Sequence, residues 1–280
     1  MGWVVRQHED AAAFLRRAGD WLTGAEAEHN LVLGIAREVA AGRASYQPPL
    51  YFATVERSGE IGGYVYRTPP FKLGISRVPV DAMPLIVKDV SRTYGDLPAV
   101  LGPAEEARIF AEQWAAAHGA HARPGMHQRI YQLVHVVPPA RMPPGEFCVA
   151  RPEHIDLVTT WLGEFRREAG IVDVRARSLA AERIAEGLYF LWLDDEPVSL
   201  AGWSAQSPNG VRVGPVYTPP EKRRRGYASA VTAAASQRAL DQGRRFCFLY
   251  TDLSNPVSNA IYQQIGYTPV CDVMDWILET

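Results

Sequence analysis

The chain has 280 residues, of which 47% are hydrophobic and 21% are charged, and its formal net charge at pH 7 is −2. This composition is typical of a globular protein long enough for two cores of modest size, and it excludes a strongly basic nucleic-acid binder. No apolar run reaches the roughly 18 residues of a membrane span, and the first residues lack the apolar segment of a secretory signal. We therefore expect a cytoplasmic protein that binds neither nucleic acid nor membranes.

Three cysteines, Cys148, Cys247 and Cys271, are far apart, and none belongs to a CxxC pair. An odd number of dispersed cysteines argues against a disulfide framework and against a cysteine-built zinc site. The histidines between positions 118 and 135 have no carboxylate or cysteine at ligand-like spacing. We therefore predict no metal site.

The first half of the chain predicts two helices, a hairpin and then alternating strands and helices. Asp10 is a candidate N-cap for the first helix, and the second helix would stop at Gly42. The hairpin would turn at Ser58-Gly59. The remaining elements would be a strand near 72–77, a helix near 83–93, a strand near 98–101, a helix over 103–118 and a closing strand over 126–137.

Four prolines and a glycine occur in the eleven residues 136–146, which predicts a linker. Beyond it the same order of elements returns. It would comprise helices over 151–170 and 177–187, a hairpin over 188–206 that turns at an acidic tract (Asp194, Asp195, Glu196), a strand over 210–218, a helix over 228–243, a strand over 245–253, a helix over 255–266 and a strand over 267–278.

An α/β layered domain used twice is the simplest account of this order. We predict a first domain at 1–137, a proline-rich linker at 138–146 and a second domain at 147–280.

A basic segment, PPEKRRR, separates the strand that ends at Thr218 from the helix that begins near Gly226. A helix N-terminus offers unpaired N–H groups and the positive end of a dipole, which together suit a phosphate. Gly226 lets the backbone approach a ligand closely, and the three arginines before it add positive charge. These residues alone also fit a solvated basic turn.

Two patterns in the second half together resemble the GNAT acetyltransferase superfamily. Arg223-x-x-Gly226-x-Ala228 is similar to the family's Q/R-x-x-G-x-G/A pyrophosphate loop, and it lies between the fourth strand and the third helix of its half. The chain departs from the commoner pattern by having arginine in place of glutamine and alanine in place of the last glycine. The resemblance covers about residues 147–280.

The second pattern begins at Asn255, places Tyr262 seven residues later and ends at the pair Gly266-Tyr267. The resemblance implies two tandem GNAT-like domains, each a mixed, mostly antiparallel sheet flanked by helices, with the first half a degenerate copy. It also implies acetyl-CoA as co-substrate and Tyr262 as the acid that protonates the departing thiolate. A phenol suits that role because it can hydrogen-bond to the sulfur as negative charge builds up there.

The resemblance further implies the residues that contact acetyl-CoA. Residues 216–218 would present backbone groups to the pantetheine arm and the thioester, residues 224–229 would hold the pyrophosphate, and Asn255 would bond the pantetheine arm. The full set is Val216, Tyr217, Thr218, Arg223, Arg224, Arg225, Gly226, Tyr227, Ala228, Ser229 and Asn255.

The implied activity is N-acetyltransfer from acetyl-CoA to a primary amine of a small molecule, by direct attack in a ternary complex. A protein or peptide N-acetyltransferase and a non-catalytic acyl-CoA sensor are the alternatives, and the oligomeric state stays open. Glu164 and Glu168, four residues apart, could serve as general base or anchor a cationic substrate, or they could form a solvated helix face. Trp203 could line the acceptor pocket or pack in the core.

The first half lacks the residues that would bind acetyl-CoA. Its corresponding loop, 76–84, contains no glycine, and Pro79 and Pro84 each remove an N–H group. Phe110 stands where the second half has a tyrosine. We therefore predict that one chain binds one acetyl-CoA, in its second half.

Overall fold

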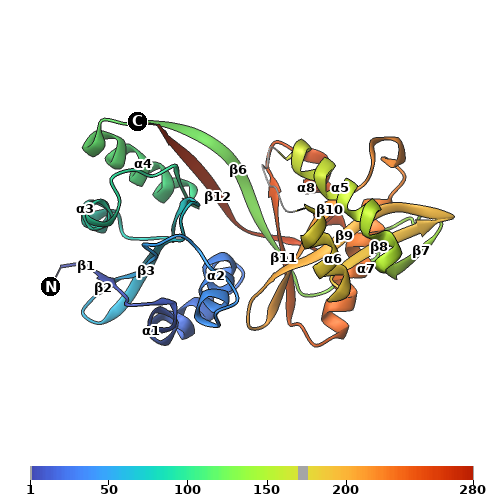
Figure 1. Ribbon diagram of the computed structural model, residues 1–280, viewed down its shortest axis with the longest axis horizontal. Helices are drawn as coiled ribbons and strands as arrows, with labels where there is room; N and C mark the ends of the chain where they lie inside the picture. Colours follow the sequence, from blue (N-terminus) through green and yellow to red (C-terminus); the bar gives the residue numbers. More distant parts are fainter. Residues whose placement is uncertain (1, 170–175, 280) are drawn as a thin grey trace. The chain divides into compact units, whose positions relative to one another are not determined.

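The computed structural model describes residues 2–169 and 176–279 (Figure 1). The strands are β1 (Val4–Gln7), β2 (Tyr51–Arg57), β3 (Glu60–Arg67), β4 (Leu73–Ile75), β5 (Ala99–Pro103), β6 (His121–Leu133), β7 (Glu146–Val149), β8 (Tyr189–Asp194), β9 (Glu196–Gln206), β10 (Gly210–Tyr217), β11 (Phe246–Asp252) and β12 (Thr268–Glu279). The helices are α1 (Ala11–Gly24), α2 (Asn30–Ala40), α3 (Met83–Thr93), α4 (Ala104–His118), α5 (Ile155–Glu168), α6 (Ala176–Ala185), α7 (Tyr227–Asp241) and α8 (Pro256–Gln264).

The chain forms two compact units. The first unit comprises Met1–Ile130, Tyr250–Ser254 and Val270–Thr280, and the second comprises Tyr131–Leu249 and Asn255–Pro269. These units differ from a simple division at 137 and 147, because the last strand returns to the first unit. There β12 pairs antiparallel with β5, from Val273 opposite Pro103 to Ile277 opposite Ala99.

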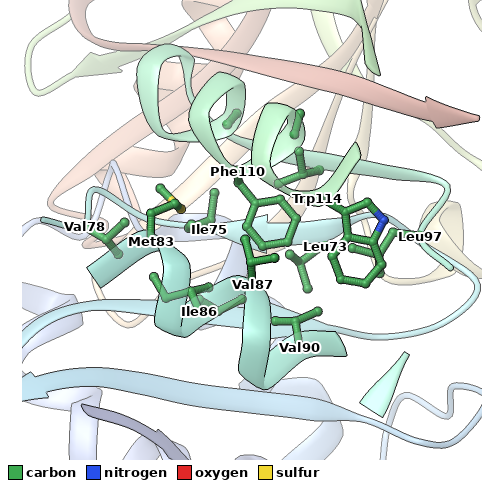
Figure 2. Packing of buried hydrophobic residues seen from close by; sticks show 14 of the residues in the cluster. Leu73, Ile75, Val78, Met83, Ile86, Val87, Val90, Leu97, Phe110 and Trp114 are labelled. Atoms are coloured by element: carbon green, nitrogen blue, oxygen red, sulfur yellow. The ribbon is translucent and has the colours of Figure 1, made fainter. Parts of the chain in front are cut away.

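The first unit has a mixed sheet with a helix pair on each face. Its strand order is β1-β2-β3-β4-β5-β12, and only β4 and β5 run parallel. Side chains alternate along each strand, so Phe52, Tyr64 and Tyr66 pack with α1 and α2. The alternate positions, such as Tyr51 and Val65, pack with α3 and α4. Figure 2 shows this second layer, where side chains of α3 and α4 meet over the strands.

The second unit repeats this architecture. Its strand order is β7-β8-β9-β10-β11, with β10 and β11 as the parallel pair. Phe190 and Trp203 pack with α7 on one face, while Leu191 and Leu200 pack with α5 and α6 on the other. Each unit is therefore a mixed, mostly antiparallel sheet flanked by helices, which confirms the predicted fold class.

The proline-rich segment 138–146 belongs to the second unit. Trp192 Nε1 donates a hydrogen bond of 2.8 Å to the carbonyl of Pro144. A Cβ at Gly145 would lie 2.0 Å from the carbonyl oxygen of Leu193, so glycine is required where the segment meets β8. The segment thus packs against its own unit as well as joining the two halves of the sequence.

Most predicted elements agree with the structure, with a few differences at their ends. β1 was not predicted, since four mostly exposed residues at a sheet edge carry little hydrophobic pattern. β6 begins at His121 rather than at 126, and Gly170, the end of a predicted helix, lies outside the described residues. Among the described helices, none has the length and apolar character needed to cross a membrane.

Candidate acyl-CoA site

β10 and β11 are paired over only part of their length. Among the described residues, parallel pairing joins 210–212 of β10 to 246–248 of β11 and goes no further. The rest of β10 continues along β9, with a register shift between Val213 and Val216 that marks a β-bulge. A bulge leaves backbone groups outside the ladder. The end of β10 therefore has an open edge that is not paired with β11, where the carbonyls of Tyr217 and Thr218 already accept from Ser199 Oγ and Arg223 Nε.

The loop after β10 leads directly into the N-terminus of α7. Arg224 has φ of +63° and Gly226, the N-cap residue, has φ of +87°. No side chain caps the helix, and its first intrahelical bond runs from the N–H of Ala230 to the carbonyl of Gly226. The N–H groups of residues 227–229 come before Ala230 in the chain and therefore have no partner within the helix. Uncapped helix N-termini and turns of alternating backbone handedness both bind anions, so this loop fits a phosphate group.

The constraint at Gly226 is conformational rather than steric. A Cβ placed there would find its nearest neighbour, Pro143 Cδ, 3.8 Å away, so a side chain would have room. A φ of +87° is nevertheless unfavourable for residues with a β-carbon. Glycine is therefore needed to shape the loop.

Two of the basic side chains stabilise the loop. Arg223 Nη2 donates to both carboxylate oxygens of Glu168, at 2.7 and 2.8 Å, and its Nε donates to the carbonyl of Thr218 at 2.8 Å. Lys222 Nζ lies 2.5 Å from a carboxylate oxygen of Glu196. The guanidinium of Arg223 thus fastens the loop to α5 and to the end of β10.

The other two arginines take part in no ion pair within residues 2–169 and 176–279. Arg224 and Arg225 are both exposed, and the side chain of Arg225 hydrogen-bonds to Tyr227. Tyr227 is buried, and its hydroxyl donates to the carboxylate of Asp194, a bond that raises the pKa of Tyr227. The acidic tract does form the predicted β8–β9 turn, with Asp195 at φ of +59°, and it also anchors the start of α7.

Both glutamates of α5 that are candidates for a general base, Glu164 and Glu168, contact the end of β10 or the loop after it. The hydroxyl of Tyr217 donates to Glu164, and burial followed by this bond raises the pKa of Tyr217 to about 12. Glu168 binds Arg223, as described above. Trp203 is buried and donates to the carbonyl of Ala235 at 3.1 Å, so it packs in the core. The two glutamates are therefore fixed at the strand end instead of forming a freely solvated face.

The residues of the second sequence pattern lie on α8. Asn255 is the N-cap, and its Oδ1 accepts from the N–H of Ser258 at 3.1 Å. Tyr262 packs against the core around α7, with its ring 6.0 Å from that of Tyr267. Burial alone raises the pKa of Tyr262 to about 12, and its hydroxyl has no hydrogen-bond partner in the described chain. Tyr262 is thus a protonated phenol with a free donor at neutral pH.

Comparisons with known proteins agree with the fold described above. Residues 189–277 match the model of the FR47-like protein family, whereas no curated protein matches the chain significantly. The whole chain superimposes on a Drosophila protein with a TM-score of 0.69, at 15% identity and covering 100% of this chain and 99% of the other. A GCN5-related N-acetyltransferase from Sphaerobacter thermophilus matches with a TM-score of 0.60, at 17% identity over 98% and 94% of the chains. A tandem GNAT protein from the clavulanic acid biosynthesis pathway matches with a TM-score of 0.55, at 12% identity over 99% and 98%.

The protein has the tandem GNAT fold. The resemblance drawn from the two sequence patterns is confirmed, and both patterns fall inside the FR47-like region. Among the described residues, no group of three or more His, Cys, Asp or Glu side chains could hold a metal ion.

Sequence reasoning missed the contacts that fix the loop between β10 and α7 in place. The pairs Arg223–Glu168, Tyr227–Asp194 and Tyr217–Glu164 join residues 33 to 55 positions apart, at no regular spacing. The sequence showed only that a basic loop and several acidic residues occur in the same half of the chain. This predicts that ion pairs form, but it does not predict which acidic residue each arginine binds.

Proposed function

We propose that the protein is an N-acetyltransferase that uses acetyl-CoA to acetylate a primary amine of a small molecule. The uncapped start of α7, at Arg224 to Gly226 beside the open edge of β10, carries this proposal. It provides free N–H groups, a positive helix end and the exposed guanidinium groups of Arg224 and Arg225 for a pyrophosphate. The fold shared with an N-acetyltransferase from Sphaerobacter thermophilus supports acyl transfer.

The binding residues have distinct tasks in this proposal. The N–H groups of residues 224–229 bind the pyrophosphate, and the open backbone edge of 216–218 aligns the pantetheine arm and the thioester. Asn255 offers its amide nitrogen to the same arm while its Oδ1 caps α8. Arg223 acts indirectly, because its bonds to Glu168 and Thr218 fix the loop.

The chemistry requires one proton donor and one proton acceptor. Acetyl-CoA supplies an activated acetyl group, which the amine takes up as its nitrogen forms a bond to the carbonyl carbon and the carbon–sulfur bond breaks. Tyr262 donates its proton to the departing sulfur, and burial keeps this phenol protonated at neutral pH. Glu164, held by Tyr217, lies on the helix expected to border the acceptor and can attract a cationic amine or accept its proton through water.

Release of free thiol from acetyl-CoA, measured over a panel of small primary amines and peptides, tests the proposal. We expect turnover with at least one small amine, and loss of that turnover in Tyr262→Phe. Turnover with peptides alone would instead indicate a protein acetyltransferase. Tight acetyl-CoA binding without turnover on any acceptor would indicate a sensor.

A further inference from the structure

The first unit contains a cavity of about 40 Å³ that none of the residues proposed above lines. Its wall includes Glu28 and His29, which precede α2, Tyr64 and Tyr66 on β3, and Tyr250 on β11. The ends of β4 and β5 also line it, together with Leu31, Ile130 and Val273. All of these residues belong to the first unit.

The cavity forms where the two parallel strands of this unit stop pairing. Leu73 pairs with Val100 and Gly74 with Leu101, and the cavity is lined by the residues that follow on each strand. The ring of Tyr66 lies directly against the backbone of Gly74, because a Cβ at Gly74 would lie 2.1 Å from Tyr66 Cε1. The glycine therefore lets the tyrosine ring cover β4 at the edge of the cavity.

Two tyrosine hydroxyls at the cavity lack hydrogen-bond partners. Tyr64 and Tyr66 are 7% and 6% exposed, and neither hydroxyl is hydrogen-bonded within the described chain. Burial raises the pKa of both phenols, so each remains a neutral group that can donate or accept. Neither hydroxyl oxygen is among the fully buried side-chain atoms that lack a partner, so each is open to a ligand or to water. These hydroxyls can therefore hydrogen-bond to a molecule in the cavity.

The charged and polar side chains of the cavity wall indicate which class of ligand could bind there. The described lining contains the carboxylate of Glu28 and several tyrosine rings, and it contains no lysine or arginine. Arg77 Nε binds one carboxylate oxygen of Glu28 at 3.0 Å from outside this lining. His29 donates from Nδ1 to the carbonyl of Leu22, which leaves Nε2 as an acceptor, and burial lowers the pKa of His29 so that it stays neutral. Such a wall offers an anion no positive side chain of its own and has several acceptors for N–H donors.

We propose that this cavity binds the head of a small organic ammonium ion. Glu28 supplies a carboxylate, and the faces of Tyr64, Tyr66 and Tyr250 supply cation–π attraction. The hydroxyls of Tyr64 and Tyr66 accept N–H hydrogen bonds. The volume corresponds to about three water-sized positions, which suits a head of roughly four heavy atoms. The inference does not depend on the proposed acetyl transfer.

Three probes of four heavy atoms each test the proposal on the full chain: propylammonium, 1-propanol and acetate. Methyl NMR of Ile75 and Ile130, which both line the cavity, reports binding at the site. We expect saturable shifts with propylammonium at millimolar concentration, the affinity range of such small ligands, and none with acetate. Equal affinity for 1-propanol would overturn the proposal, because it would show an apolar cavity. Absence of saturation with propylammonium would show a water-filled cavity and would overturn it as well.

Variants then test the residues. Glu28→Gln should weaken propylammonium about tenfold, and Tyr66→Phe should weaken it severalfold. Glu38→Gln and Tyr46→Phe are matched controls, since both residues lie in the first unit outside the cavity lining, and both should leave the affinity unchanged. Leu101→Phe, which fills the cavity, should abolish the shifts. Displacement of propylammonium by acetyl-CoA would assign the cavity to the thioester and would contradict the proposal.

Discussion

The loops after β4 and β10 follow corresponding strands of the two units and have opposite surroundings. After β10, residues 223–226 are exposed, and two of them have positive φ. After β4, Val78 and Met83 are buried in the core (Figure 2), as is Ala82. No residue from 76 to 83 has positive φ. The loop after β4 thus stabilises its own unit, whereas the loop after β10 presents its backbone to solvent.

The difference continues into the helices. Pro84 is the second residue of α3 and has no N–H group to offer, whereas α7 begins with three residues that keep theirs. On α4, Phe110 is fully buried, while Tyr262 on α8 keeps a free hydroxyl. The same order of elements can therefore serve packing in one unit and ligand binding in the other, depending on which backbone groups stay accessible.

The largest expected difference between the units is the presence of an acetyl-CoA site. We expect calorimetric titration of the whole protein with acetyl-CoA to give one site per chain. A stoichiometry of two, or protection of Val78–Met83 from hydrogen exchange by acetyl-CoA, would contradict the comparison drawn above.

Tyr262→Phe should lower turnover by about tenfold to several thousandfold while acetyl-CoA affinity persists, because it removes one proton donor and little volume. Tyr267→Phe is the matched control. It removes a buried hydroxyl that bonds Ser236, so it should lower stability without removing the acid. Wild-type turnover in Tyr262→Phe would mean that this tyrosine only packs.

The same tyrosine gives a pH prediction. Its pKa is raised from 10.0 to about 12, so the proton needed for catalysis is present below that pH and is lost only as the pH approaches it. The rate should therefore not fall through ionisation of Tyr262 below about pH 11. A decline near pH 9 that disappears in Tyr262→Phe would contradict the assignment.

Gly226→Val should weaken acetyl-CoA binding at least tenfold, because a β-branched residue disfavours φ of +87° and the loop must change shape. Gly119→Val is the control, since Gly119 has φ of +66° at the end of α4 and nothing lies within 4 Å of its added Cβ. Both variants should lose stability, but only the first should lose affinity in calorimetry. Unchanged affinity in a folded Gly226→Val protein would remove the pyrophosphate assignment.

The sequence was sufficient to predict the layered fold and most of its elements, because helix and strand periodicities are local. The helix predicted near 83–93, for example, is α3. The return of β12 to β5 was not predictable, since a strand pattern at 267–278 does not state which strand it pairs with. The role of Arg223 was missed for a similar reason, because its partners Glu168 and Thr218 are selected by the fold. Pairing between distant segments requires the three-dimensional structure.

The smallest expected effect concerns the Arg–Glu pairs that follow the two strands. Arg223 binds Glu168 after β10, and Arg77 binds Glu28 after β4, so both units fasten this loop to a helix pair. The side chains of Arg223 and Glu168 are 42% and 50% exposed, and such pairs contribute at most about 1 kcal/mol. Arg223→Ala should therefore weaken acetyl-CoA only about two- to fivefold, while Arg77→Ala should have no effect on that affinity. Calorimetry of Arg223→Ala, Glu168→Gln and the double variant measures the coupling. The losses should be non-additive and smaller at high salt, whereas additive losses would show that Arg223 contacts the ligand directly.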